Sequence, residues 1–222
     1  MFSKHKKIIL FANGELPEPK NLIPQINSED VLIAVDGGID HITSLGFKPN
    51  LIIGDLDSIN MEALEEFRSQ GAVIHQYPRE KDQTDLELAL EFALERKAKT
   101  IWVVAALGNR LDQTLANIFL LTKPQLAKID IRLVDGLREV FLIRNAKEIR
   151  GQPGQRVSLL PLNGIAEGIQ TEGLKYPLNN ETLYPEQTRG ISNEIISTSA
   201  RVSLQQGLLL CIHEFSPPTE RS

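Results

Sequence analysis

Two short acidic segments carry the residues best suited to chemistry. The first follows an apolar run and contains Asp55 and Asp57, and the second opens a strongly helical stretch and contains Asp82 and Asp85. Two carboxylates about 4 Å apart repel by roughly 4 kcal/mol at an effective dielectric near 20, so a compact set of four indicates a bound cation. Ligands that are all oxygen, with no His or Cys nearby, indicate a hard ion such as Mg²⁺, held together with phosphate groups.

The elements that must position these acids are short strands alternating with helices. Up to about residue 135, β-branched apolar runs predict strands at 7–11, 31–35, 51–53, 73–76, 100–105 and 129–134. Helical periodicity predicts helices at 61–70, 86–97 and 112–121. This alternation predicts an α/β fold whose N-terminal part is a doubly wound, mostly parallel sheet with helices on both faces.

In such a sheet the acids meet at one edge, because ligands bind beyond the carboxyl ends of parallel strands. The run 51–53 leads directly to Asp55 and Asp57, which in an extended chain point the same way about 6 to 7 Å apart. Asp82 and Asp85 share one face of a first helical turn. Asp36 ends the strand 31–35 in the same manner, so three strand ends are acidic.

Each acidic segment also has a purely structural interpretation. Asp82 is a suitable N-cap and Asp85 a suitable N3 residue, which together stabilise a helix end by about 1 kcal/mol. Asp57 and Ser58 suit the cap of a helix that begins near residue 60. Capping does not account for three acidic strand ends in one sheet, so the metal interpretation is favoured.

After Asp135 and Gly136 the helical period disappears and turn signals become frequent. Strands are expected at 139–143, 156–160, 194–197, 201–205 and 208–213, which predicts a smaller all-β sandwich domain. The expected division is a catalytic domain over 1–136, a β-sandwich over 137–216 and a loose tail over 217–222.

Composition restricts the class of protein. The 222 residues carry a net charge of −5 without long blocks of either sign, so no nucleic-acid partner is expected. No apolar run is long enough for a membrane span or for the core of a signal peptide. The single cysteine, Cys211, lies in an apolar run and is expected to be a buried hydrophobe, which fits a reducing, cytoplasmic compartment.

A further polar segment follows the strand 100–105 and opens a helix. It contains Arg110, Asp112 and Gln113, and both the arginine and the amide end of the helix are suited to phosphate oxygens. An ion pair between Arg110 and Asp112 explains the segment equally well. The chain has neither a P-loop nor a dinucleotide-binding glycine pattern, so a nucleoside triphosphate would be bound in another way.

The ordered series of these motifs resembles the thiamine pyrophosphokinase family. The resemblance covers nearly the whole chain and runs through Asp36-Gly37-Gly38, Gly54-Asp55-Leu56-Asp57-Ser58, Lys81-Asp82-Gln83-Thr84-Asp85-Leu86-Glu87, Gly108-Asn109-Arg110-Leu111-Asp112-Gln113, Ser158-Leu159-Leu160-Pro161, Gly173-Leu174-Lys175-Tyr176-Pro177-Leu178 and Gly190-Ile191-Ser192-Asn193-Glu194. Single motifs are only moderately specific, whereas their order is highly specific.

The resemblance implies an α/β catalytic domain, a β-sandwich domain and a homodimer with thiamine bound where the subunits meet. It implies transfer of the pyrophosphoryl group of ATP to the hydroxyethyl oxygen of thiamine, with Mg²⁺ held by Asp55, Asp57 and Asp85. Asp82 or Asp85 would accept the hydroxyl proton. The nucleotide would contact a further group of residues: Asp36, Ser58, Arg110, Asp112 and Gln113.

For thiamine, the resemblance implies Ser192 and Asn193 as hydrogen-bonding groups and Tyr176 as an aromatic surface, which also suits a cationic thiazolium ring. Two other classes remain open. One is a Mg²⁺-dependent phosphohydrolase with Asp55 as nucleophile, although it leaves the second half of the chain unexplained. The other is a nucleotide or vitamin sensor without turnover.

Overall fold

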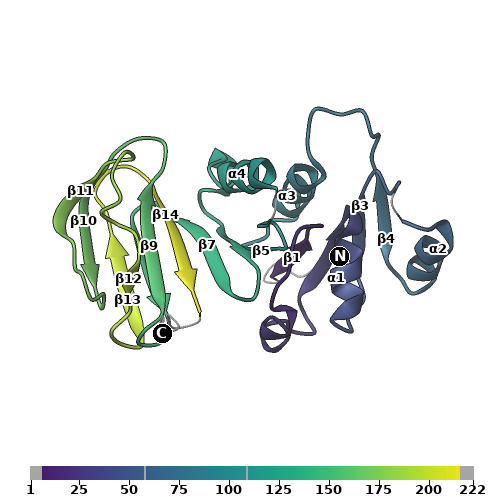
Figure 1. Ribbon diagram of the computed structural model, residues 1–222. Coiled ribbons are helices and arrows are strands. Elements are labelled where there is room, and N and C mark those ends of the chain that lie inside the picture. Colours follow the sequence, from purple (N-terminus) through teal and green to yellow (C-terminus); the bar gives the residue numbers. More distant parts are fainter. Residues whose placement is uncertain (1–6, 58, 109, 216–222) are drawn as a thin grey trace. The chain divides into compact units, whose positions relative to one another are not determined.

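Parallel strands form the sheet of the first part of the chain (Figure 1). The computed structural model describes residues 7–57, 59–108 and 110–215, and the chain divides into two units between Gly136 and Leu137. The strands of the first unit are β1 (Ile8–Phe11), β2 (Val31–Val35), β3 (Leu51–Gly54), β4 (Val73–Gln76), β5 (Thr100–Val104) and β6 (Asp130–Val134). They lie in the order β6-β5-β1-β2-β3-β4, and each neighbouring pair is parallel, which confirms the predicted sheet.

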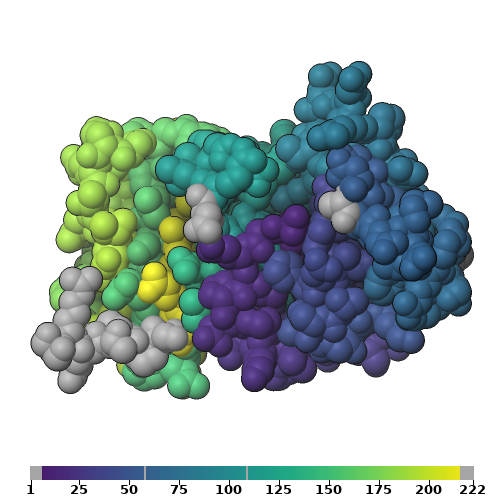
Figure 2. Space-filling view, turned by 45° about the vertical axis from the view of Figure 1, so that its right-hand side comes forward, coloured from purple at the N-terminus to yellow at the C-terminus, as the bar shows by residue number. Residues whose placement is uncertain are grey.

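Helices cover both faces of this sheet, as predicted. They are α1 (Ile39–Ser44), α2 (Met61–Ser69), α3 (Asp85–Glu95) and α4 (Leu111–Leu120). Alternate strand residues such as Ile9, Leu32 and Ile52 pack in one core with residues of α1 and α2. The intervening residues point to the opposite face, where α3 contacts β1, β2 and β3. Helix α4 buries none of its residues fully, and its side chains lie at the surface in Figure 2.

The strand order creates a crevice between β1 and β5. The chain runs from β1 outward to β4 and then returns to β5 on the other side of β1. The loops after β1 and β5 therefore leave the sheet edge in opposite directions, and such a switch point is where open α/β sheets bind ligands. Short 3₁₀ turns complete the unit at Pro19–Asn21, Ile23–Gln25, Asp36–Gly38 and Pro124–Leu126.

The second unit is a sandwich of two antiparallel sheets, which confirms the predicted fold class. Its strands are β7 (Arg138–Ile143), β8 (Ala146–Arg150), β9 (Arg156–Pro161), β10 (Ala166–Glu172), β11 (Asn179–Leu183), β12 (Asn193–Glu194), β13 (Ser199–Ser203) and β14 (Leu209–Glu214). One sheet has the order β12-β9-β14-β7 and the other β11-β10-β13-β8. Apolar residues of both sheets, with the fully buried Cys211, make up its core.

Two predicted strands are shifted, and three strands were not predicted. The strand expected at 194–197 is the two-residue β12, and the strand expected at 201–205 begins two residues earlier, as β13. Strands β8, β10 and β11 are rich in polar residues and bury only one face, so they lack a continuous apolar run. The short helix α1 was also not predicted.

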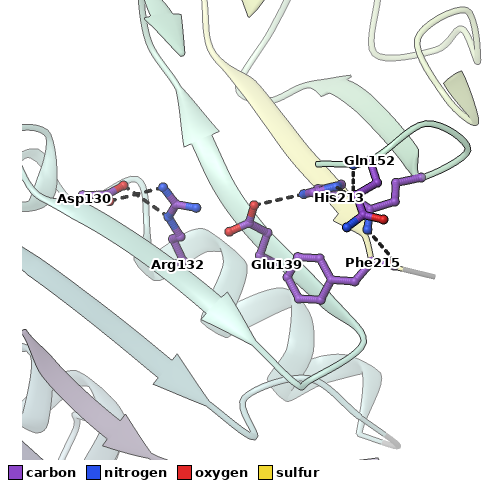
Figure 3. A network of polar contacts seen from close by, with 7 residues as sticks. Asp130, Arg132, Glu139, Gln152, His213 and Phe215 are labelled. Atoms are coloured by element: carbon purple, nitrogen blue, oxygen red, sulfur yellow. Dashed lines mark hydrogen bonds and ion pairs between the residues drawn. The ribbon is translucent and has the colours of Figure 1, made fainter. Parts of the chain in front are cut away.

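A buried polar network supports the second unit (Figure 3). His213 of β14 is 1% exposed and contacts the Glu139 carboxylate of β7 at 3.0 Å through Nδ1. Its Nε2 lies 2.9 Å from Gln155 Oε1, and Gln155 Nε2 donates to the Phe215 carbonyl. The network joins β7, β14 and the start of β9. Among the residues described, no helix has the length and apolar character needed to cross a membrane.

Candidate active site at the carboxyl edge of the sheet

Asp36, Asp55 and Asp85 come together at the carboxyl edge of the sheet. Asp36 follows β2, Asp55 follows β3, and Asp85 is the first residue of α3. Burial, a hydrogen bond to Asp85 and the charge of Asp55 raise the pKa of Asp36 to about 7. Its Oδ1 atom is buried and accepts no hydrogen bond. Near neutral pH Asp36 therefore takes up a proton far more readily than an ordinary aspartate, because its ionised form is partly buried and is repelled by the neighbouring carboxylates.

Gly54 allows this approach. Its φ is +157°, and a Cβ atom placed there would lie 1.7 Å from Asp36 Oδ1. Asp36 itself has φ +49°, an uncommon conformation for a residue with a side chain. Because Gly54 has no side chain, the Asp36 carboxyl can lie against the end of β3. The left-handed backbone of Asp36 is the conformation in which it does so.

Two of the predicted metal ligands are paired with cations of the loop between β4 and α3. Arg79 Nη1 lies 3.4 Å from Asp57 Oδ2, and Lys81 Nζ contacts Asp85 Oδ1. The Asp57 amide also donates to Asp55 Oδ1 at 3.2 Å, which fixes the turn after β3. Within residues 7–57, 59–108 and 110–215, no three His, Cys, Asp or Glu residues are arranged to hold a metal ion. The predicted acids are near one another but face these cations.

The structural interpretations of the acidic segments were wrong in detail. The N-cap of α3 is Thr84, whose hydroxyl accepts from the Glu87 amide, so Asp82 is not the cap and lies exposed. The cap of α2 is Asn60, whose side chain accepts from the Glu62 amide. Ser58 lies outside the described residues. The acids are therefore not required as helix caps.

A cavity of about 700 Å³ adjoins Asp36 and Asp85. It occupies the crevice between β1 and β5, within the first unit. Its lining is Ala12, Asn13, Gly14, Glu15, Val35, Asp36, Thr84, Asp85, Leu86, Ala105, Ala106, Leu107, Gly108, Arg110, Gln113, Thr114, Ala116 and Asn117. The volume falls in the range of small-ligand pockets. The cavity lies between Asp36, Asp55 and Asp85, here called the acidic edge, and the segment that opens α4.

Arg110 and Gln113 line this cavity as the sequence suggested for a nucleotide-binding segment. Arg110 forms a two-bonded pair with Asp112, at 3.3 Å from Nε and 2.6 Å from Nη2. The pair raises the pKa of Arg110 and lowers that of Asp112. Both side chains are about two-thirds exposed, so the pair is open to exchange with an anionic ligand.

Thr114 and Asn117 also line the cavity, although neither was predicted from the sequence. Asn117 Nδ2 donates to the Ala106 carbonyl at 2.8 Å, and the Thr114 hydroxyl accepts from the Gly108 amide at 3.2 Å. Their spacing of three puts both on the cavity side of α4, a signal available once the helix is recognised. These bonds hold the loop after β5 against α4.

The predicted thiamine residues form a separate group in the second unit. The Asn193 side chain is 8% exposed, accepts from the Tyr176 amide at 3.0 Å and donates to the Tyr176 carbonyl at 2.7 Å. The Tyr176 side chain is 59% exposed. Ser192 has φ +57°, and its amide donates to Ser158 Oγ. Asn193 thus holds the backbone that presents the Tyr176 ring.

The acidic edge fits a hard divalent cation. Its donors are carboxylate oxygens, and Asp36 Oδ1 is a buried acceptor without a partner. Burial and repulsion by Asp85 raise the pKa of Asp36, and a cation bound here would offset the same repulsion. A parallel α/β sheet with acids and a cavity at its switch point places the chain in the class of doubly wound α/β proteins that bind a ligand beyond the carboxyl ends of their strands.

Comparison with known proteins identifies the family. The family model described as "Thiamin pyrophosphokinase, catalytic domain" matches residues 24–133, and that described as "Thiamin pyrophosphokinase, vitamin B1 binding domain" matches residues 143–209. A thiamine pyrophosphokinase from Bacillus subtilis is 34% identical over 213 residues, covering 93% of this chain and 98% of the relative.

Solved structures agree. The crystal structure of the thiamine pyrophosphokinase from Bacillus subtilis superposes with a TM-score of 0.85 at 30% identity, covering 95% of this chain and all of the other. That from Geobacillus thermodenitrificans gives 0.80 at 27% identity, covering 95% and 98%. The chain belongs to the thiamine pyrophosphokinase family and is an ATP-dependent diphosphotransferase.

Proposed function

We propose that the chain makes thiamine diphosphate and AMP from thiamine and ATP at the acidic edge of its first unit, with Mg²⁺ held by Asp55, Asp57 and Asp85. The observation that carries this proposal is the convergence of Asp36 and Asp85 on a cavity of ligand size that Arg110 also lines, with Asp36 Oδ1 buried and without a partner. Such a cluster favours a cation. When bound there, the ion would offset the negative charge of the phosphate groups during the transfer.

The acids and the loop before α3 would have distinct roles. Asp57 and Asp85 become available to the ion when Arg79 and Lys81 turn away. The pair of Arg79 and Asp57 is exposed and therefore weak, whereas that of Lys81 and Asp85 is largely buried and needs another positive charge on Asp85 before it separates. Asp82 is exposed and belongs to neither pair, so it is the better candidate for accepting the hydroxyl proton. A carboxylate such as Asp85, once bound to a metal, is a poor base.

ATP would occupy the cavity between β1 and β5. Arg110 leaves Asp112 to contact phosphate oxygens, and Gln113 contributes from the first turn of α4. Asp36 and Ser58 complete the set of nucleotide-contacting residues. In the transfer, the thiamine oxygen bonds to the β-phosphorus, the bond from that phosphorus to the bridging oxygen breaks, and AMP leaves with that oxygen.

Thiamine would be recognised by the second unit. The exposed ring of Tyr176 stacks on the aminopyrimidine, the Ser192 hydroxyl provides a hydrogen bond, and Asn193 fixes the tyrosine backbone. We infer that two copies assemble with the thiamine site where they meet, and that the protein works in the cytoplasm, in line with its buried single cysteine.

Product identification tests this proposal. The chain is incubated with ATP, Mg²⁺ and thiamine, and the nucleotides and thiamine esters are separated by chromatography. Thiamine diphosphate and AMP in equal amounts support the transfer. ADP and free phosphate without a thiamine ester would instead support the phosphohydrolase class, and ADP with thiamine monophosphate would contradict transfer of a pyrophosphoryl group. Binding of both ligands without any product would support a sensor.

A further inference from the structure

Lys81 occupies an unusual place within the acidic edge. Its ammonium contacts Asp85 Oδ1 and lies 5.7 Å from the centre of the Tyr77 ring. Its positive charge also lowers the pKa of Asp36, against the effect of the neighbouring acids. The Lys81 side chain is 16% exposed and that of Asp85 19%. The neighbouring pair of Arg79 and Asp57 is a surface contact, with side chains 80% and 51% exposed.

Helix stability does not explain a lysine at this position. Lys81 precedes α3, which begins at Asp85, and a cation near a helix N-terminus is disfavoured by the helix dipole. The N-cap of α3 is made by Thr84 without it. The ion pair with Asp85, and not the helix, therefore holds the Lys81 side chain in its position.

The nucleotide cavity is short of positive charge. Among the described residues that line it, Arg110 is the only cation, and it is paired with Asp112. Glu15, Asp36 and Asp85 contribute acidic groups to the same lining. A triphosphate brought next to these acids needs further cations, and the chain has no P-loop lysine to provide one.

We propose that Lys81 is a catalytic residue that exchanges partners: its ammonium would leave Asp85 when that carboxylate takes up a divalent ion, and would then bind the oxygens of the transferred phosphoryl groups. This inference rests on the proposed metal site. A lysine suits the role because its charge is compact and sits on a flexible four-carbon stem. No bond is made or broken by Lys81 itself, which stabilises charge as it develops.

The exchange predicts two effects of opposite sign when the charge is removed. Lys81→Gln loses the phosphate contact, so kcat falls about 10²- to 10³-fold. The same variant no longer competes with the metal for Asp85, so Mg²⁺ binds more tightly, by about fivefold or more, because the pair of Lys81 and Asp85 is largely buried and its loss exceeds that of an exposed pair. A residue with only a structural role would weaken both properties together.

The experiment measures Mg²⁺ affinity by calorimetry without nucleotide, and kcat and KM for ATP at saturating Mg²⁺. The variants are Lys81→Gln and Lys81→Arg, with Lys99→Gln as a control for loss of an exposed lysine at the opposite end of β5. Tighter Mg²⁺ binding with a lower kcat in Lys81→Gln, partial activity in Lys81→Arg and unchanged values in Lys99→Gln are expected.

Unchanged kcat in Lys81→Gln, or Mg²⁺ binding that is equal or weaker, would overturn the inference. Should Lys81→Gln fold poorly, Lys81→Arg decides: full activity with unchanged Mg²⁺ affinity would overturn it, whereas reduced kcat with retained affinity would support it. Failure of the proposed function is distinguishable, because the unsubstituted protein would then bind no Mg²⁺ or make no thiamine diphosphate.

Discussion

Asp36 is the residue of the acidic edge whose charge is most affected by its neighbours. Asp36 is half-buried against Asp85 and Asp55, and its pKa of about 7 is well above its ordinary value of 3.8. Relative to the unfolded chain, this group contributes most stability below pH 4, and the contribution is lost as the pH rises through 7. The residue that best marks the site is therefore also a source of instability at neutral pH.

Replacing Asp36 by Asn removes this instability. Without divalent ions, Asp36→Asn should raise the melting temperature over the unsubstituted protein, and the difference should grow between pH 5 and pH 8. After allowance for solvent screening we expect about 1 kcal/mol, or roughly 2 to 4 °C, at pH 8. Thermal unfolding at several pH values measures this. A difference independent of pH would mean that Asp36 is ionised throughout.

Asp57 is predicted to act in turnover and not in folding. Its side chain is 51% exposed and pairs with the mobile end of an arginine, so Asp57→Asn should leave the melting temperature within about 1 °C. Loss of a metal ligand should lower kcat about 10²- to 10³-fold. Asp40→Asn, which changes an exposed acid of α1, is the control. Retained activity of Asp57→Asn would remove this residue from the metal site.

The residue types at the site were predictable, but the partners of individual side chains were not. Asp36 and Asp55 were expected at one edge because each follows an apolar strand, and Asp85 because it opens the helix after the next strand; the structure has all three at that edge. The pairing of Asp57 with Arg79 depends on the path of the loop after β4 and on side-chain torsions, and no sequence pattern records these. The same holds for Asn193, whose amide faces the Tyr176 backbone.

At the scale of elements, the contact between the ends of β2 and β3 is made possible by a glycine. Gly54→Ala would place a methyl group 1.7 Å from Asp36 Oδ1, and overpacking of this kind destabilises by about 1 to 3 kcal/mol. Gly71→Ala is a matched control, because it also has positive φ but nothing lies within 4 Å of the added atom.

Urea unfolding measures both glycine variants. The expected order of stability is the unsubstituted protein, then Gly71→Ala, then Gly54→Ala. The double variant Gly54→Ala with Asp36→Ala should recover part of the loss, because the colliding carboxyl is removed. Equal losses in the two single variants would show that backbone strain alone matters and that the close contact does not.

Helix α4 forms one wall of the nucleotide cavity. Two hydrogen bonds, made by the Thr114 and Asn117 side chains, hold the preceding loop against this helix. Asn117→Ala removes the bond to the Ala106 carbonyl, with an expected stability loss of about 1 kcal/mol. Because the loop is then less well held, KM for ATP should rise several-fold. Thr122→Ala is the matched control, because it removes the hydrogen bond from the Thr122 hydroxyl to the Phe119 carbonyl, which lies at the other end of α4, away from the cavity. Equal KM values in the two variants would argue against a role for the loop.

Elements with continuous apolar runs were predictable, and those with one exposed face were not. Strands β1, β2 and β3 are buried along their whole length, so their β-branched runs are plain in the sequence. Strand β11 reads Asn-Asn-Glu-Thr-Leu and buries only Leu183 fully. Its pairing with β10 decides its conformation, and that contact is not local.

At the scale of the whole molecule, the proposed function places the thiamine site where two copies of the chain meet. The chain has a mass of 24.8 kDa, and sedimentation equilibrium should give about twice this value. Thiamine should stabilise the dimer, because its proposed site lies where the copies meet. A monomer that still makes thiamine diphosphate at full rate would contradict the shared site.

The acidic edge is expected to bind the divalent ion used in the transfer. Mn²⁺ binding followed by electron paramagnetic resonance tests it most directly, with Mg²⁺ as competitor. We predict about one site per chain in the unsubstituted protein, displaced by Mg²⁺, and binding weakened tenfold or more in Asp55→Asn with the melting temperature preserved. Unchanged Mn²⁺ affinity in Asp55→Asn would contradict the assignment of the metal to this edge.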